Sequence, residues 1–353
     1  MKKFIVFVFA LVALCGLASC GGAKEYKLGM GVEVSTTSSA NASEAKAGTA
    51  QVDATVAAVV LDAEGKIVVC RIDAVQNKIA VSATGAVTVP TSFKTKMELG
   101  SDYGMATNPY SADNNGDGVI KEWNEQVKVF EQYVVGKTAA EVSNFDIKTL
   151  DNGYKISNDD ALLSAGCTIQ ITDFIAAVVK ACNDDQAVTF SAKEFTLGVA
   201  ASSFNDGSKN ATAEAAGAVQ VYSDFAATVV ADGKIAAALN DAIQPKFAVS
   251  STGVLTASFK NTKRGLKAEY GMATNPYSAD NNGDGVIKEW YEQSAVFSKY
   301  VVGKTGSEVA SLEIKTLDNG YKISNDDALL NAGCTIQITS IMEVVAKAFT
   351  NAR

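Results

Sequence analysis

The sequence of 353 residues contains no histidine and only four prolines. The absence of histidine excludes Ser-His-Asp and Cys-His hydrolytic machinery, histidine-ligated haem and most zinc enzymes. Histidine is also the side chain whose ordinary pKa lies closest to neutral pH. The protein's own side chains are therefore poorly suited to acid–base catalysis, which favours a binding role or chemistry supplied by a cofactor.

Cysteine is scarce as well, and its spacing is not that of a metal site. Six cysteines are present, and Cys15 and Cys20 fall within an N-terminal leader. The other four form no C-x-x-C pair, and they are Cys70, Cys167, Cys182 and Cys334. We therefore expect neither a zinc site nor a disulfide framework.

Basic residues are fewer than acidic ones. The chain has 31 Lys and Arg against 39 Asp and Glu, a formal net charge of −8, and no basic stripe. Nucleic acid is therefore not expected as a partner. Hydrophobic residues make up 47% of the chain, which is enough to build buried cores, so we expect globular structure.

The one long hydrophobic run lies at the N-terminus. Two lysines precede the apolar segment 4–14, which is too short to span a bilayer, and small residues then lead to Cys20. This pattern is typical of lipoprotein processing. We expect residues 1–19 to be a signal peptide, Cys20 to carry lipid on the extracytoplasmic face of a bacterial membrane, and residues 20–25 to form a tether. The alternative is an ordinary secretory peptide cleaved near Ala18.

An internal duplication organises the rest of the chain. Residues 103–123 recur without change as residues 270–290, and two further blocks recur at the same offset of 167 residues. A period of this length indicates tandem domains, because solenoid repeats are much shorter. We expect repeat domain 1 at 26–183, a linker at 184–189 and repeat domain 2 at 190–353.

Each repeat predicts an α+β fold, in which an antiparallel sheet containing a β-hairpin packs against helices. Apolar residues spaced by three and four predict a helix over residues 120–134. Thr138 and Glu141 then form a capping box for a short helix. Hairpins are expected at 52–60 with 66–74 and at 224–231 with 234–241, and terminal helices at 173–181 and 340–349. The segments 35–49 and 200–216 are expected to be loop with some strand.

A loop at residues 113–119, present in both repeats, carries oxygen-bearing side chains at its first, third and fifth positions. Asp113, Asn115 and Asp117 occupy positions 1, 3 and 5, and Gly118 occupies position 6. This spacing directs oxygens toward one centre, as calcium requires. Over about a dozen residues the loop resembles the calcium loops of EF-hand and dockerin proteins.

That resemblance implies a structural calcium ion in each repeat. Position 12, a bidentate glutamate in EF-hand loops, is Asn124 here and Tyr291 in the second copy, so a nearby glutamate would have to substitute for it. The alternative is a turn rich in Asp and Asn that caps a helix without metal. The candidate ligands are Asp113, Asn115, Asp117, Val119 and Glu122, with Asp280, Asn282, Asp284, Val286 and Glu289 in the second copy.

A turn of small residues precedes the last helix of each repeat and reads Ser-Ala-Gly-Cys-Thr, ending at Thr168, in the first. Backbone N–H groups of such a turn can form a seat for a phosphate. The stretch resembles the attachment segment of the bacterial FMN-binding domain, in which the last threonine of a Ser/Thr-Gly-Ala-Ser/Thr turn is esterified to FMN. The alternative is a plain strand-to-helix turn with a buried cysteine.

The resemblance implies that Thr168 and Thr335 meet FMN. Because the turn differs from the family pattern, covalent and non-covalent binding both stay open. Lys137 and Lys304 would meet the phosphate or else face solvent. The remaining cofactor-binding candidates are Gly166, Cys167, Gly333 and Cys334, and the large side chains that would pack on the flavin, or otherwise belong to the core, are Tyr103, Met105, Trp123, Tyr154 and their copies.

The sequence thus predicts a lipid-anchored electron carrier that binds one FMN in each repeat and meets redox partner proteins. Such a protein transfers electrons without transforming a substrate. A second interpretation is a calcium-stabilised surface lipoprotein that binds a polysaccharide or a protein. A third, a solute-binding protein with one cleft between its domains, is disfavoured because near-identical copies suggest two equivalent sites.

Overall fold

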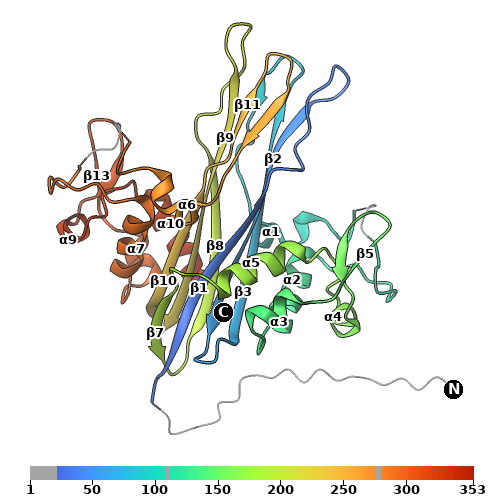
Figure 1. Ribbon diagram of the computed structural model, residues 1–353, viewed down its shortest axis with the longest axis horizontal. Coiled ribbons are helices and arrows are strands. Elements are labelled where there is room, and N and C mark those ends of the chain that lie inside the picture. Colours follow the sequence, from blue (N-terminus) through green and yellow to red (C-terminus); the bar gives the residue numbers. More distant parts are fainter. Residues whose placement is uncertain (1–21, 109–111, 276–279) are drawn as a thin grey trace.

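The computed structural model describes residues 22–108, 112–275 and 280–353, and it confirms a mixed α+β fold with antiparallel sheets. The first sheet has the strand order β4-β3-β2-β1-β7 (Figure 1). Its strands are β1 (Lys24–Ser35), β2 (Gly48–Leu61), β3 (Ile67–Val81), β4 (Val87–Thr88) and β7 (Val188–Ala192).

In the second sheet the central strand β9 pairs with β8, β10 and β11, and β11 pairs with β12. The strands are β8 (Thr196–Asn205), β9 (Gly217–Ala231), β10 (Lys234–Ile243), β11 (Lys246–Val249) and β12 (Leu255–Ser258). The two halves of the chain, as we call the regions of the predicted repeats 26–183 and 190–353, each have a small separate hairpin. It is formed by β5 (Ile147–Thr149) with β6 (Lys155–Ser157) in the first half and by β13 (Ile314–Thr316) with β14 (Lys322–Ser324) in the second.

The helices follow the same order in both halves. In the first half they are α1 (Lys96–Leu99), the 3₁₀ turn η1 (Gly100–Tyr103), α2 (Trp123–Tyr133), α3 (Ala139–Ser143), α4 (Asp160–Ser164) and α5 (Thr172–Cys182). In the second half they are α6 (Lys263–Leu266), η2 (Lys267–Tyr270), α7 (Trp290–Tyr300), α8 (Gly306–Ala310), α9 (Asp327–Asn331) and α10 (Thr339–Thr350).

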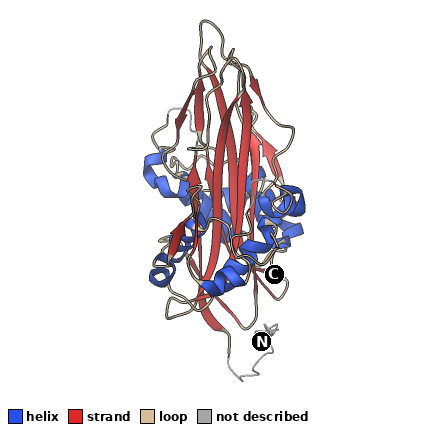
Figure 2. Ribbon diagram, turned by 90° about the vertical axis from the view of Figure 1, so that its right-hand side faces the viewer, coloured by secondary structure: helices blue, strands red, loops and turns tan. Residues whose placement is uncertain are grey.

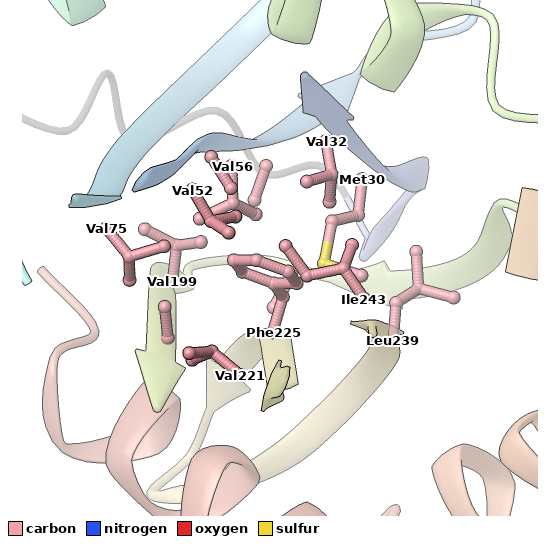
Figure 3. Packing of buried hydrophobic residues seen from close by; sticks show 14 of the residues in the cluster. Met30, Val32, Val52, Val56, Val75, Val199, Val221, Phe225, Leu239 and Ile243 are labelled. Carbon is pink, nitrogen blue, oxygen red and sulfur yellow. The ribbon is translucent and has the colours of Figure 1, made fainter. Parts of the chain in front are cut away.

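The two sheets pack face to face, and the helices of each half cover the outer face of its sheet (Figures 1 and 2). The layer order is therefore helix, sheet, sheet, helix. Side chains from both halves build the core between the sheets, where Phe225 lies among Met30, Val52 and Val56 (Figure 3). The two halves thus share one apolar interior.

Strand β2 shows how a strand serves two cores at once. Val56, Ala58 and Val60 point into the shared core, whereas Ala57 and Val59 belong to the cluster under the helices. Successive side chains of a strand point to opposite faces of the sheet. Because both faces are buried, β2 is an almost unbroken apolar run, unlike a strand with one face in solvent.

Glycines allow the terminal helices to lie directly on the sheets. A Cβ atom at Gly29 would lie 2.1 Å from the carbonyl oxygen of Ala181 in α5. The corresponding distance in the second half, from Gly198 to the Ala348 oxygen of α10, would be 1.9 Å. No side chain fits in that space, so the close approach of helix to strand requires glycine at both positions.

The chain between the halves is also part of the packed structure. Strand β7 pairs with β1, so a segment at the start of the second half completes the first sheet. Asp184 forms a buried ion pair with Arg264, at 3.0 Å between Oδ2 and Nη2. At the far end of the strands, the N–H groups of Ala42 and Ala211 donate to Gly253 and Gly85 of the opposite half.

The predicted hairpins, the capping box at Thr138 and the terminal helices are confirmed. The helix expected from residue 120 begins instead at Trp123, because Glu122 forms its N-terminal capping box. The segments 35–49 and 200–216, expected to be loop with some strand, contain the start of β2 and the end of β8.

Among the residues from 22 onward that are described, no helix has the length and apolar character needed to cross a membrane. The predicted lipid-bearing residue, Cys20, and the predicted signal peptide lie outside the described residues.

Replacement of Phe225 by alanine should destabilise both halves, because its fully buried ring lies in the core that they share. The expected loss is about 3–5 kcal/mol. Urea unfolding can be followed separately in the two halves through the single tryptophans left by Trp290→Phe and Trp123→Phe. In Phe225→Ala the unfolding midpoints reported by the two tryptophans should fall together. Tyr321→Ala, at an exposed position, is the control and should change neither midpoint. A change seen by Trp290 alone would contradict the shared core.

Candidate functional site

A pocket of about 660 Å³ opens between the helical layer and the sheet of the first half. Strands β2 and β3 form its floor, α1, α2 and α5 contribute side chains, and the β5–β6 turn lies at its edge. The volume lies within the range of about 300–1,000 Å³ that is usual for small-molecule sites.

Five residues selected from the sequence line this one pocket. They come from four separate parts of the first half, and they are Tyr103, Met105, Trp123, Tyr154 and Thr168. Trp123 is buried and packs edge-on against Phe174, whereas Tyr154 is 56% exposed. The aromatic faces thus run from the interior of the pocket to its rim.

Charged groups of both signs complete the lining. The Lys96 ammonium lies 4.9 Å from the ring centre of Tyr103 and 5.5 Å from that of Trp123, within cation–π range. Both carboxylate oxygens of Asp53 accept hydrogen bonds from Nε2 of Gln51, at 3.0 and 2.7 Å. Burial raises the pKa of Asp173, and the carboxylate of Glu33 raises it further.

Lys96 is positioned by the start of α1. Thr95 and Glu98 form a capping box there, and the Met97 N–H donates to Oδ1 of Asp73 at 3.2 Å. Asp73 is 1% exposed, and burial raises its pKa to about 7. A buried carboxyl on β3 thereby fixes the short helix that carries Lys96.

The turn at Thr168 is folded tightly against its own half. Gly166 has φ +92°, and the N–H groups of Gly166 and Cys167 donate to Leu163 and Leu162. The Thr168 N–H donates to Oε1 of Gln126 at 2.8 Å, and the Thr168 hydroxyl lies 3.3 Å from the same oxygen. These amides are satisfied within the fold, so the predicted phosphate seat has no free N–H group at these three positions.

Only Thr168 of the predicted cofactor-binding turn lines the pocket. Cys167 is fully buried, and burial raises its pKa to about 12. The second copy repeats this arrangement, since Cys334 is fully buried, Gly333 has φ +90° and the Thr335 N–H donates to Gln293. Both cysteines therefore pack within the core clusters of their halves.

The acidic loop is held by its own backbone. Asp113 accepts from the N–H groups of Gly116, Asp117 and Gly118, and these bonds, led by that of Gly118, lower its pKa. Asp117 accepts from the Val119 N–H at 2.8 Å. In the second copy, Asp280 and Asp284 make the same bonds, the latter with Val286.

One predicted ligand is engaged elsewhere. The Glu122 carboxylate accepts from the N–H groups of Met105 and Ala106, and the Glu122 N–H donates to the Glu125 carboxylate at the start of α2. Glu289 does the same with Met272 and Ala273. These glutamates tie the preceding loop to the helix, so an ion in the acidic loop would need other oxygens to complete its shell.

One atom in each loop still lacks a partner. Oδ1 of Asn115 and Oδ1 of Asn282, at position 3 of the two loops, are buried without a hydrogen bond. A ligand oxygen is expected at this position in a calcium loop. Within the described ranges, no three Cys, Asp or Glu side chains lie close enough together to form a metal site, so an ion would depend on amide and backbone oxygens.

Sequence reasoning did not identify Asp53, Gln76, Lys96 or Gln126 as pocket residues. Asp53 and Gln76 lie on strands whose outward face could be assigned only after the pairing of the sheets was known. The capping box at Thr95 was a signal that would have placed Lys96 at the start of a helix.

Comparison of the chain with protein-family models, curated proteins and solved structures gave no match.

The free energy of unfolding should depend on pH through Asp73. Its pKa is higher in the folded protein than the ordinary 3.8, so folding favours the protonated form. Stability should fall as pH rises from about 4 to about 7, by roughly 4 kcal/mol at about 1.4 kcal/mol per pKa unit. Asp73→Asn keeps an acceptor for Met97 and should abolish this component.

Urea unfolding of both proteins at about pH 4.5 and about pH 7.5 would measure the effect. Asp102→Asn, at an exposed carboxyl, is the control. An unchanged pH dependence in Asp73→Asn would contradict the assignment.

Proposed function

We propose that this protein binds FMN in the pocket of its first half and carries electrons at the extracytoplasmic surface of a bacterial membrane. The observation that supports the proposal is the meeting of Thr168 with Tyr103, Met105, Trp123 and Tyr154 in one pocket. Thr168 matches the attachment threonine of FMN-binding domains, and the other four side chains are those that the sequence offers to pack on a flavin ring.

The lining suits a planar ring with polar edges. Tyr103, Trp123 and Tyr154 would hold the ring faces, and aromatic contacts of this kind contribute about 0.5–1.5 kcal/mol beyond their buried area. Lys96 and Lys78, two cations on the walls, would meet carbonyl or phosphate oxygens. Because the Thr168 side chain is buried beside Gln126, we propose that binding is non-covalent.

FMN supplies the redox chemistry, so the chain needs only to bind it, orient it and exclude water. That division of labour fits a protein without histidine. Lipid on Cys20 would keep the carrier at the membrane surface, where redox partner proteins could reach it.

A second candidate function, saccharide binding, is favoured by the amide and carboxylate groups of the same pocket. Asp53, Gln76, Asn152 and Gln170 line it beside the aromatic rings, and sugar rings combine apolar faces with many hydroxyl groups. The pocket's two carboxylates would also disfavour a phosphate more than a neutral sugar.

We further propose a structural calcium ion in each acidic loop. The unpartnered Asn115 and Asn282 oxygens support it, together with the exposed carboxylates of Asp113 and Asp280. The ion would tie each loop to the following helix without taking part in chemistry.

Replacement of Tyr154 by alanine should weaken FMN binding about tenfold, because one aromatic face at the rim is lost. Quenching of Trp123 fluorescence, measured in a Trp290→Phe background, would report binding. Tyr321→Ala is a matched control, since Tyr321 is the copy of Tyr154 and is 57% exposed. Equal weakening by both variants, or no saturable quenching, would contradict the proposal.

The same titration separates the two candidate functions. Riboflavin in place of FMN tests the contribution of the phosphate, and cellobiose tests the saccharide. Binding of cellobiose without either flavin would replace electron carriage by saccharide binding.

Calcium should raise the melting temperature by several degrees relative to EDTA, since an ion at 100 times its Kd stabilises a site by about 2.7 kcal/mol. Asp113→Asn combined with Asp280→Asn should remove this shift. Asp151→Asn with Asp318→Asn changes the same number of exposed charges and is the control. Identical melts with calcium and EDTA would leave the loops as metal-free turns.

A further inference from the structure

The second half places two aromatic rings where the first half has its pocket. Ser35 and Asp53 are opposite each other on β1 and β2, and both line the pocket. Phe204 and Tyr222 are opposite each other at the same place on β8 and β9. The glycines that contact the terminal helices, Gly29 and Gly198, fix this correspondence. Ser35 follows Gly29 by six residues, and Phe204 follows Gly198 by six.

These rings form an ordered stack. The Phe204 and Tyr222 ring centres lie 5.3 Å apart with an interplanar angle of 3°. The Tyr222 hydroxyl accepts from Nζ of Lys263 at 3.1 Å and donates to Oε1 of Gln244 at 2.6 Å. The same ammonium lies 4.4 Å from the Tyr222 ring centre. A ring with an oxygen at its edge is therefore held by one lysine and one glutamine.

Lys263, which contacts Tyr222, and Lys96, which among the described residues has no such tyrosine beside it, take the same position relative to two other rings. Lys263 lies 5.2 Å from the ring centre of Tyr270 and 5.3 Å from that of Trp290. Lys96 lies 4.9 and 5.5 Å from the corresponding rings of the first half. The aromatic pair that positions the cation is thus already in place in the open pocket.

Among its described residues, the first half has no counterpart of the Tyr222 hydroxyl, which bonds Lys263 and Gln244 in the second half. Gln76 and Gln244 correspond, since each follows by three residues the buried aspartate, Asp73 or Asp241, that anchors the next helix. Gln76 and Lys96 both line the pocket. Across the described part of the chain, neither the Lys96 ammonium nor the Gln76 amide makes a hydrogen bond or an ion pair.

We infer that Tyr222, stacked on Phe204, occupies in the second half the place that the ligand occupies in the first. Of these two corresponding places, the one in the first half is then open, and its ligand presents a planar aromatic ring with an oxygen at the edge to Lys96 and Gln76. This inference rests on the proposed function for the location of the ligand. It gives a physical reason for one ligand per chain, where the sequence alone predicted one in each repeat. The carbonyl-bearing edge of a flavin ring belongs to this class.

Two double variants exchange the local features of the halves. Ser35→Phe with Asp53→Tyr should close the first pocket, whereas Phe204→Ser with Tyr222→Ala should open the second. The probes are p-cresol, which reproduces the tyrosine side chain, and FMN, each titrated by calorimetry. We expect one equivalent bound by the wild type, none by the closed variant and two by the opened variant.

A second pair of variants tests the contact rather than the space. Lys96→Met should weaken p-cresol binding at least tenfold. Lys263→Met is the matched control and should leave binding to the wild-type pocket unchanged, provided that circular dichroism shows it folded. If the opened variant does not fold, the closed variant and the Lys96→Met comparison still decide the matter.

Each outcome separates this inference from the proposed function. If the wild type binds one equivalent of p-cresol but does not bind FMN, the proposed FMN carrier is refuted and the inference is supported. No binding of p-cresol by the wild type, full binding by the closed variant, or equal effects of the two lysine variants would overturn the inference. Two FMN per wild-type chain would overturn it while leaving the FMN proposal intact.

Discussion

The apolar contact between the two sheets is the interaction on which the rest of the structure depends. Each sheet has one face toward the other, and residues such as Val56 and Phe225 lose all contact with water there. A small polar group fixes the register of this contact, since the Asn77 amide donates to Ser203 and Ser223 within the core. Neither sheet could be exposed without opening this interior, so the halves are expected to fold as one unit.

This packing also decides where a site can form. The inner faces are committed to the shared core, so ligands can reach only the outer faces, where helices and loops leave space. Along β2, Asp53 and Thr55 point outward while Val52 and Ala54 point inward. At matching places in β9, Tyr222 points outward and Val221 inward. The halves therefore differ in their outer faces while keeping an apolar inner face.

Local features of the fold could be predicted from the sequence, whereas the pairing of the sheets could not. Turn residues and helix caps act over a few positions, so the hairpin that turns at Gly65 and the helix after Thr138 were both predictable. The aromatic residues that line the pocket were predicted from the sequence as side chains able to pack on a flavin ring. Lys96 and Gln76 were missed, because their proximity depends on strand register and on contacts between residues far apart in the chain.

The inner face of each sheet has a consequence for the origin of the protein. A single ancestral copy would have exposed this apolar surface to water, and a second identical copy is the natural partner to cover it. The founder of this chain would then have been a symmetric homodimer, whose subunits became joined when its gene was duplicated. Fusion would have freed one half to change, and Phe204 with Tyr222, at the places of Ser35 with Asp53, marks one position where the halves now differ.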